Sequence, residues 1–357
     1  MKVQKWELAN KIRKLRTVVP KQAAVPILQN ILIEDGRLTA TNMELTVSTT
    51  LQESEGETML IPVKAFGLID QLPSGEVEIS SRKRNGRNGI MIRSGTAIKN
   101  VFETMDPAEF PRGGVYDSGE NEATINGEEL AGAIRNVLYA VAKTSAKQNM
   151  CAVCMECNGE ALTFTGLNGQ QVAQDWIPYA EAPFRLLIPR SAAEQLISLG
   201  LEGDVIINYS SVYASFQSDE YMVQTRLVEG EYFNVGKLFR EEGYLVELMR
   251  EPFSKAVRRA DMCNEDSNPV PVRIDLEGDS MKVYIQSSAA AYSETLPINT
   301  DVGEKMTIGF NPALLRTTME SFGDEKVDAF FISPKMPLIV RSKTSQLRAL
   351  LLPVMVR

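Results

Sequence analysis

The feature that most constrains the fold is a threefold internal repeat with a period near 120 residues. Three amphipathic segments recur along the chain: WELANKIRKL from residue 6, GEELAGAIRNV from residue 127 and REPFSKAVRRA from residue 250. Their aligned apolar anchors, Leu8, Leu130 and Phe253, are 122 and 123 residues apart. Solenoid repeats are much shorter, so each copy has the size of a complete domain with its own core.

The rest of each copy recurs as well. A predicted strand–turn–strand follows each first helix, in ILIEDGRLTA, VCMECNGEALTF and RIDLEGDSMKVYI, with turn glycines Gly36, Gly159 and Gly278. A second amphipathic helix follows in IPVKAFGLIDQLPSG, IPRSAAEQLISLG and FNPALLRTTMESFG. In the third copy Asn311 is a predicted cap, with Pro312 at the first helical position.

These elements predict an α+β fold of three repeated domains, each with two helices packed on antiparallel β-sheet. The predicted domains are residues 1–118, 119–240 and 241–357. Turn-rich or charged links fall near residues 111–123 and 234–244.

The composition excludes several enzyme classes. The chain has no histidine, which removes Ser-His-Asp and Cys-His catalysis together with the commonest metal ligand. It also contains no Walker loop or dinucleotide fingerprint, and CNEDSN at 263–268 lacks calcium-loop spacing. A carboxylate-dependent enzyme stays open as an alternative, although the absence of a convergent acidic motif counts against it. The missing motifs lead us to expect neither a cofactor nor a metal. We expect a cytoplasmic protein, because the charged N-terminal segment lacks a signal peptide's apolar core, and no membrane contact, because the longest apolar run is too short to span a bilayer.

Three cysteines are close together in MCAVCMEC: Cys151, Cys154 and Cys157. They allow either a zinc or iron–sulfur site or strand residues with packed thiols. Side chains alternate along a strand, which would place Cys151 and Cys154 on opposite faces. This spacing favours packed thiols.

The outward faces of the first helices carry positive charge although the net charge is −8. Five residues after each anchor stands an arginine, at Arg13, Arg135 and Arg258, about 140° around the helix from the core. Each could belong to a solvated surface, but the threefold recurrence indicates a basic surface for phosphate backbone. The hairpin SRKRNGRNGI (81–90), with Arg82, Lys83, Arg84 and Arg87, fits either a solvated tip or a nucleic-acid contact.

Several stretches, in order along the whole chain, resemble the bacterial sliding clamp family, the DNA polymerase III beta subunits. They are VPILQNILIEDGRLTATNMELTV (25–47), TMDPAEFP (104–111), RLVEGEYFN (226–234), IGFNPALL (308–315) and the terminal LLLPV. The resemblance implies a head-to-tail homodimer that encircles double-stranded DNA as a ring, without catalytic residues. It also implies a polymerase catalytic subunit and a clamp loader as partners. The basic residues that would face DNA are Lys11, Arg13, Lys14, Arg135, Lys143, Lys147, Lys255, Arg258 and Arg259.

The resemblance further implies a hydrophobic cleft for partner peptides between the second and third domains. Its walls would be Leu167, Gly169, Val172, Asn311, Leu314, Met336, Leu352, Pro353, Val354 and Met355. The family pattern TDGHRLA is here LNGQQVA, so Gln170 and Gln171 replace His and Arg, and the tail LPVMVR is longer than usual. Alternatives are a clamp-like paralogue of a mobile element or repair pathway, or a protein-interaction scaffold without DNA.

The C-terminal LRALLLPVMVR is predicted to complete the third domain. Residues up to about Leu352 would form its last strand, and Pro353 would end the pairing because it has no N–H to donate. Residues 354–357 would then form an apolar lip on the peptide cleft.

Overall fold

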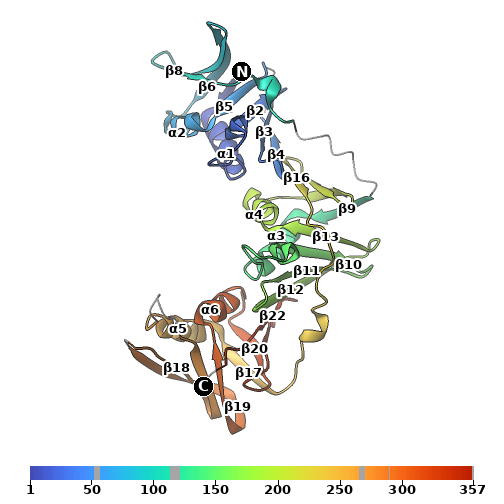
Figure 1. The fold of residues 1–357 in the computed structure, drawn as a ribbon, viewed down its shortest axis with the longest axis vertical. Coiled ribbons are helices and arrows are strands. Elements are labelled where there is room, and N and C mark those ends of the chain that lie inside the picture. The colour runs from blue at the N-terminus through green and yellow to red at the C-terminus, as the bar shows by residue number, and fades with distance from the viewer. Residues whose placement is uncertain (52–56, 113–120, 265–269, 289, 356–357) are drawn as a thin grey trace. The chain divides into compact units, whose positions relative to one another are not determined.

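The computed structural model describes residues 1–51, 57–112, 121–264, 270–288 and 290–355 (Figure 1). The chain divides into two compact units. Unit 1 comprises Met1–Ala131 and Ser191–Leu227, and unit 2 comprises Gly132–Arg190 and Val228–Arg357. The predicted domain 119–240 is thus shared between the units, and the division into three domains stays a prediction.

The described residues contain six α-helices, and each lies where the repeat places a helix. They are α1 (Lys5–Leu15), α2 (Val63–Gln71), α3 (Gly127–Leu138), α4 (Arg190–Leu199), α5 (Arg250–Asp261) and α6 (Pro312–Glu320). Asn311 caps α6 as predicted, since its Oδ1 accepts hydrogen bonds from the N–H groups of Ala313 at 3.0 Å and Leu314 at 3.2 Å. Short 3₁₀ helices are η1 (Pro26–Gln29), η2 (Pro107–Glu109), η3 (Gln148–Cys151) and η4 (Gly236–Leu238).

Unit 1 is built on an antiparallel sheet of eight strands. Their order is β5 (Met59–Pro62), β2 (Asn30–Glu34), β3 (Arg37–Thr41), β4 (Leu45–Thr50), β16 (Tyr221–Arg226), β15 (Tyr213–Gln217), β14 (Asp204–Tyr209) and β9 (Asn121–Asn126). Its middle seam pairs β4 with β16, with Tyr221 opposite Thr49. A separate four-stranded sheet has the order β1 (Lys2–Gln4), β6 (Glu76–Arg84), β7 (Arg87–Ser94) and β8 (Ile98–Glu103).

Unit 2 repeats the eight-stranded arrangement. The order is β13 (Phe184–Pro189), β10 (Ala152–Cys157), β11 (Ala161–Leu167), β12 (Gln171–Pro178), β22 (Arg348–Leu351), β21 (Leu338–Arg341), β20 (Lys326–Phe331) and β17 (Tyr244–Met249). At its middle seam β12 and β22 lie side by side (Figure 1), with Gln174 opposite Arg348. A two-stranded sheet, β18 (Val272–Gln286) and β19 (Ala291–Phe310), completes the unit.

The strand–turn–strand prediction is wrong in the third copy. Gly36 and Gly159 have positive φ (73° and 98°) in tight turns between β2 and β3 and between β10 and β11. Gly278 also has a positive φ of 58°, but it lies within the continuous strand β18, where the register to β19 shifts on both sides of it. The glycine there permits a bulge, because the long partner β19 pairs with both halves of β18.

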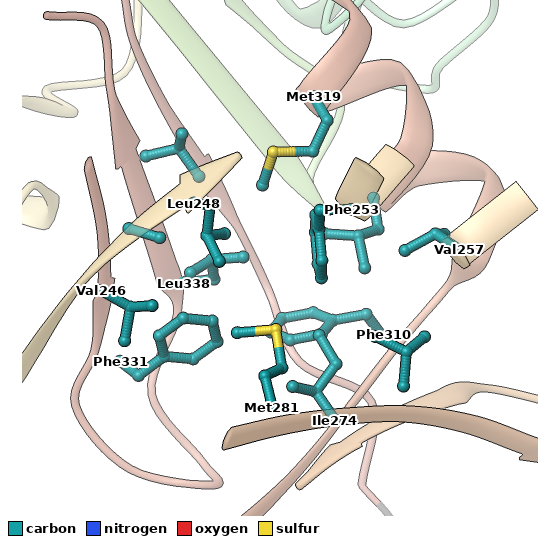
Figure 2. Packing of buried hydrophobic residues seen from close by; sticks show 14 of the residues in the cluster. Val246, Leu248, Phe253, Val257, Ile274, Met281, Phe310, Met319, Phe331 and Leu338 are labelled. Atoms are coloured by element: carbon teal, nitrogen blue, oxygen red, sulfur yellow. The ribbon is translucent and has the colours of Figure 1, made fainter. Parts of the chain in front are cut away.

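The core of unit 2 shows how the helices are oriented (Figure 2). Phe253 and Val257 from α5 and Met319 from α6 meet side chains of the strands, among them Ile274, Met281, Phe310 and Phe331. The predicted α5 stripe of Phe253, Val257 and Ala260 is fully buried. Burial of this stripe leaves the opposite face of α5, which carries Arg258, in solvent.

Candidate functional site

The three recurring arginines are all exposed, in agreement with their predicted outward position. Arg13, Arg135 and Arg258 each lie in the last turn of their helix. Arg13 Nη2 contacts Asp70 Oδ1 at 3.4 Å, and an exposed pair of this kind contributes at most about 1 kcal/mol. Within the described residues, Arg135 and Arg258 have no ion-pair partner. Their charges are therefore available to an anionic ligand.

The prediction for Lys11 is wrong, because this side chain is buried in unit 1. Its Nζ donates hydrogen bonds to Thr49 Oγ1 at 3.2 Å and to the Thr50 carbonyl at 2.5 Å, and it pairs with Glu220 Oε1 at 3.2 Å. The sequence indicated the burial of Lys11, since Lys11 is three residues after Leu8 and four before Leu15, within the buried stripe. Lys11 stabilises the seam between β4 and β16 and cannot reach a DNA phosphate.

Lys14 is half-buried and also has intramolecular partners. Its Nζ donates hydrogen bonds to the carbonyl oxygens of Ser198 and, at 3.2 Å, of Leu199, at the C-terminal end of α4. Gln195 of α4 in turn donates from Nε2 to the Lys14 carbonyl at 3.0 Å. A cation at a helix C-terminus is favoured by the helix dipole, so Lys14 joins α1 to α4.

The other two predicted DNA-binding residues of α5, Lys255 and Arg259, are exposed but paired. Lys255 lies 2.6 Å from Glu251 one helical turn away. Arg259 forms hydrogen bonds with both carboxylate oxygens of Glu294 and with the Tyr292 hydroxyl. The hydrogen bonds from Arg259 and then Tyr292 hold the pKa of Glu294 below its usual value. Arg258 is thus the α5 cation most available for binding.

Two predicted cations follow α3, and four lie on the β6–β7 hairpin. Lys143 and Lys147 are exposed, and the Lys147 ammonium lies 5.5 Å from the ring centroid of Phe233. On the hairpin, Arg87 pairs with Glu103 at 3.3 Å, while Arg82 and Lys83 are exposed. The side chain of Arg84 lies outside the described residues. The hairpin joins β6 to β7 in the four-stranded sheet.

Three of the predicted peptide-binding residues of unit 2, Leu167, Gly169 and Val172, lie at or next to the turn that joins β11 to β12. Asn168 Oδ1 accepts hydrogen bonds from the N–H groups of Gln170 and Gln171, both at 2.9 Å. Gly169, between them, is exposed and has a φ of 88°. A side chain added at Gly169 would meet no other atom within 4 Å, so the glycine serves the backbone conformation of this turn.

Gln171 fixes this turn to α6. Its side-chain Nε2 donates to the Leu314 carbonyl and to Thr318 Oγ1, both at 2.9 Å, and its Oε1 accepts from Asn168 Nδ2 at 3.1 Å. The residue is only 1% exposed. Sequence reasoning noted Gln171 as a departure from the family pattern, but nothing in the local sequence indicated that it bonds to a helix 143 residues away.

Leu167 and Val172 are buried, and their place in the wall of the peptide cleft stays a prediction. They pack with Phe330, Ile339 and Leu350 on one face of the unit 2 sheet. The segment 232–239 covers that face, with Tyr232, Phe233, Val235 and Phe239 packed against the same cluster. Leu167 and Val172 thus lie between the sheet and the segment 232–239.

The C-terminal segment lies beside the 168–171 turn. The last strand ends at Leu351, one residue before the prediction, and the Leu352 N–H donates to the Gln170 carbonyl at 2.9 Å. The Val354 N–H donates to the Gly309 carbonyl at 2.8 Å, so pairing resumes after Pro353. The side chains of Leu352, Val354 and Met355 are nevertheless exposed, Met355 by 68%. Residues 356 and 357 lie outside the described residues.

The other predicted peptide contacts differ in accessibility. Asn311, Leu314 and Met336 are half-buried. Asn311 uses its side-chain oxygen to cap α6, and Leu314 packs against the core of unit 2. Met336 lies in the turn between β20 and β21. Among the predicted peptide-binding residues, the large apolar side chains that are exposed are Leu352, Val354 and Met355.

A residue that sequence reasoning missed entirely is Arg348 at the seam of unit 2. Its guanidinium carbon is 5.3 Å from the ring centroid of Trp176 and 4.2 Å from that of Phe239. Its Nε also donates to Gln174 Oε1 at 3.1 Å. Burial lowers the pKa of this guanidinium. The stack fastens Phe239, and with it the covering segment, to the sheet.

The cysteines are packed thiols in two of three cases. Burial, followed by the charge of Glu156, raises the pKa of Cys154 to about 12, and the Cys157 thiol donates to the Glu181 carbonyl at 3.4 Å. Cys151 ends η3 instead of lying in the strand. Within the described ranges, no three Cys, Asp or Glu side chains are placed to hold a metal ion. The acidic stretch 263–268 lies largely outside those ranges.

Across the described part of the chain, no helix combines the length and the apolarity that a membrane span requires.

Comparisons with known proteins find similarity to DNA polymerase III beta subunits, through a family model in the C-terminal part and through relatives over most of the chain. Residues 239–355 match the family model for the DNA polymerase III beta subunit, C-terminal domain. The chain is 24% identical to the beta sliding clamp of Chlamydia pneumoniae, over 97% of this chain and 96% of that protein. It is 23% identical to the beta sliding clamp of Vibrio cholerae, over 91% of each chain.

Solved structures share the fold at lower identity. A sliding clamp (DNA polymerase III subunit beta) from Pseudomonas aeruginosa, solved bound to griselimycin, superposes with a TM-score of 0.91 at 18% identity, covering 100% of this chain and 99% of that one. A protein from Eubacterium rectale described as a DNA polymerase III beta subunit gives 0.89 at 21% identity, covering 99% and 98%.

Proposed function

We propose, from the premise that this chain is a divergent member of the bacterial sliding clamp family, that it is a processivity factor. It would encircle duplex DNA as a homodimeric ring and tether a replicative polymerase. Its relatives are accessory subunits without catalytic activity, and the absence of histidine agrees with a non-enzymatic role. A cytoplasmic location follows from this role.

The observation that carries the proposal is the recurrence of an exposed arginine at one position of three equivalent helices. Arg13, Arg135 and Arg258 occupy that position in a chain of net charge −8. Side chains of this kind neutralise phosphates without reading sequence, which suits a protein that must slide. A closed ring holds DNA topologically, so a few weak contacts suffice.

The edge strand β8 supports assembly into a dimer. It is the last strand of the four-stranded sheet, and the side chain of Val101 on it is exposed. An unpaired edge with an exposed apolar side chain is a template for pairing with another chain. We therefore expect Val101→Glu to shift the protein toward monomer in analytical ultracentrifugation, whereas Lys99→Glu on the same strand would not.

Partner peptides would bind in unit 2, beside the 168–171 turn and the C-terminal segment. Leu352, Val354 and Met355 provide exposed apolar surface there. Deletion of residues 354–357 should abolish binding of a polymerase-derived peptide in fluorescence anisotropy while the dimer persists. Unchanged binding would remove this segment from the site.

The proposed DNA contacts are tested by charge reversal. A variant with Arg13→Glu, Arg135→Glu and Arg258→Glu would be loaded by a bacterial clamp loader onto nicked circular duplex, and its retention would be measured by gel filtration. We expect retention to fall at least tenfold. A matched control reverses three exposed cations outside α1, α3 and α5, namely Lys99, Lys237 and Lys335, and changes the net charge equally.

The arginines also stabilise their own helices, since each is in a last turn where the helix dipole attracts a cation. Thermal unfolding of both variants separates a loss of helix stability from a loss of DNA contact. Equal loss of retention in the control, or a loss that follows unfolding, would contradict a specific role for the three arginines.

A further inference from the structure

The exposed face of α1 carries an aromatic side chain that the proposed duplex contact does not use. Trp6 is 69% exposed, although burial of a tryptophan removes some 150–250 Å² from water and is strongly favourable. The other tryptophan of the chain, Trp176, is partly buried and stacked on Arg348. Trp6 is thus a large apolar surface held in solvent at a fixed place on a helix.

The neighbours of Trp6 on that face are polar or cationic. Asn10 and Arg13 follow it by four and seven residues and are both exposed, so the three side chains form one row. At 1.5 Å per residue, Arg13 is about 10 Å along the axis from Trp6. Arg16 adds a second exposed cation at the end of the helix. The acidic residue of α1, Glu7, is buried, and Asp70 of α2 forms the exposed 3.4 Å pair with Arg13.

An aromatic ring beside cations on a rigid element is the arrangement that binds single-stranded nucleic acid. The cation attracts the phosphate backbone, and the ring stacks on an unpaired base. A duplex offers no free base face to the indole, so Trp6 would add little to the duplex contacts of Arg13. Charge complementarity and the flat apolar ring therefore favour an unpaired strand over both duplex DNA and an acidic peptide.

We infer that Trp6 is a stacking platform for an unpaired base of single-stranded DNA, with Arg13 binding the adjacent backbone. The inference rests on the proposed function, because it takes the outward face of α1 as the DNA-facing surface. It adds to that function a preference for DNA that is partly single-stranded, such as a primer–template junction.

The two tryptophans make a direct test possible. Trp176→Phe keeps a ring against Arg348 and leaves Trp6 as the sole indole of the full-length protein. Iodide should quench the free variant strongly. A 20-nucleotide oligothymidylate at low salt should then shift and quench the emission of Trp6 and protect it from iodide. The matching blunt duplex should change the emission much less.

Substitution of the ring gives the second measurement. In fluorescence anisotropy with labelled oligothymidylate, Trp6→Ala should weaken binding about five- to a hundredfold, as expected for one stacked base. Trp6→Phe should recover part of the loss. Both variants should be retained on circular duplex like the wild type, so this result is independent of the proposed clamp function.

Four results would overturn the inference. They are iodide-resistant emission in the free protein, oligothymidylate binding that leaves Trp6 emission unchanged, equal quenching by duplex, and an unaltered affinity of Trp6→Ala. The first would indicate that Trp6 is covered by protein, such as a second copy of the chain.

Discussion

The two eight-stranded sheets have the same topology but opposite chemistry on one equivalent row of side chains. In unit 2 the row is Leu167, Val172, Leu350, Ile339, Phe330 and Leu245, in register across β11, β12, β22, β21, β20 and β17. In unit 1 the equivalent row is Thr41, Thr46, Gln224, Ser215, Asn208 and Glu122. Every apolar residue of one row thus corresponds to a polar residue of the other.

The turns at the two seams are equally similar. Asn42 caps its turn as Asn168 does, with Oδ1 accepting from the N–H groups of Glu44 at 3.0 Å and Leu45 at 2.8 Å. Met43, with a φ of 80°, takes the place of Gly169. The Arg226 N–H donates to the Glu44 carbonyl at 3.0 Å, as Leu352 does to Gln170. The asparagine-capped turn and its backbone hydrogen bond to the neighbouring chain segment therefore occur in both units.

The side chains around the two turns differ in polarity. Thr41 and Thr46 hydrogen-bond to each other at 2.8 Å between their hydroxyl oxygens, where unit 2 has Leu167 and Val172 under an apolar cover. Arg226 stands where unit 2 has the exposed Leu352. The comparison teaches that the same topology carries different side chains in the two units, and we expect the proposed peptide site in unit 2 and not in unit 1.

The largest effect should come from giving unit 2 the chemistry of unit 1. Leu350→Gln places an amide in a fully apolar cluster and should lower the free energy of unfolding by about 3 to 5 kcal/mol. Urea unfolding in a Trp6→Phe background would report unit 2 through Trp176 alone. The control Leu350→Met should cost less than about 1.5 kcal/mol. A loss below that value for the glutamine would contradict the apolar role of the row.

A smaller effect is expected at the turn. Gln171→Ala removes the hydrogen bonds to Leu314, Thr318 and Asn168 and should lower stability by about 1 to 3 kcal/mol. Peptide affinity should fall with it, since the turn loses its attachment to α6. The neighbouring Gln170 is exposed, so Gln170→Ala should change stability by no more than about 0.5 kcal/mol. Equal effects of both substitutions would show that the attachment is unimportant.

Acid should weaken unit 2 through a neighbouring row of charged side chains, in which Glu247 lies opposite Asp328 and Asp328 opposite Arg341. The equivalent residues of unit 1, Thr124, Ile206 and Gln217, carry no charge. Hydrogen bonds from Lys326 and Lys343 lower the pKa of Glu247 to about 2. Because the folded pKa lies below the unfolded value, this stabilisation is present above about pH 4.5 and is lost as pH falls toward 2. Urea midpoints measured across that range should fall less in Glu247→Gln than in the wild type. Glu242→Gln, at an exposed site, should behave like the wild type.

The smallest effect should come from placing an apolar side chain in the polar row of unit 1. Gln224 is only partly buried, so Gln224→Leu should change stability by no more than about 0.5 kcal/mol. It should also create no peptide binding in unit 1. Hydrogen exchange of β16 with and without a polymerase-derived peptide would check this. New protection there would mean that the polar row is what excludes a second site.

The sequence predicted those parts of the fold that depend on local periodicity. Helix positions, the cap at Asn311 and the exposure of Arg13, Arg135 and Arg258 follow from apolar spacing and were correct. The same spacing places Lys11 within the buried stripe of α1, because it lies three residues after Leu8 and four before Leu15, so its position and not its charge decides its environment.

The parts that the sequence did not predict depend on contacts between distant segments. The burial of Leu167 and Val172 results from residues 232–239 folding over β11 and β12, and the Arg348 stack joins three segments. Pairing partners across a seam, such as Gln174 and Arg348, are not encoded in any local pattern, because each strand alone only alternates its faces. Gly278 failed for a related reason, since a glycine with positive φ serves a bulge as well as a turn.

The most direct test of the clamp function compares circular with linear DNA. The wild-type protein would be loaded onto nicked circular duplex with a bacterial clamp loader, and half of the sample would then be cut once with a restriction enzyme. Gel filtration would measure the protein that stays with the DNA. A sliding ring should remain on the circle and leave the linear ends, whereas equal retention on both would contradict it.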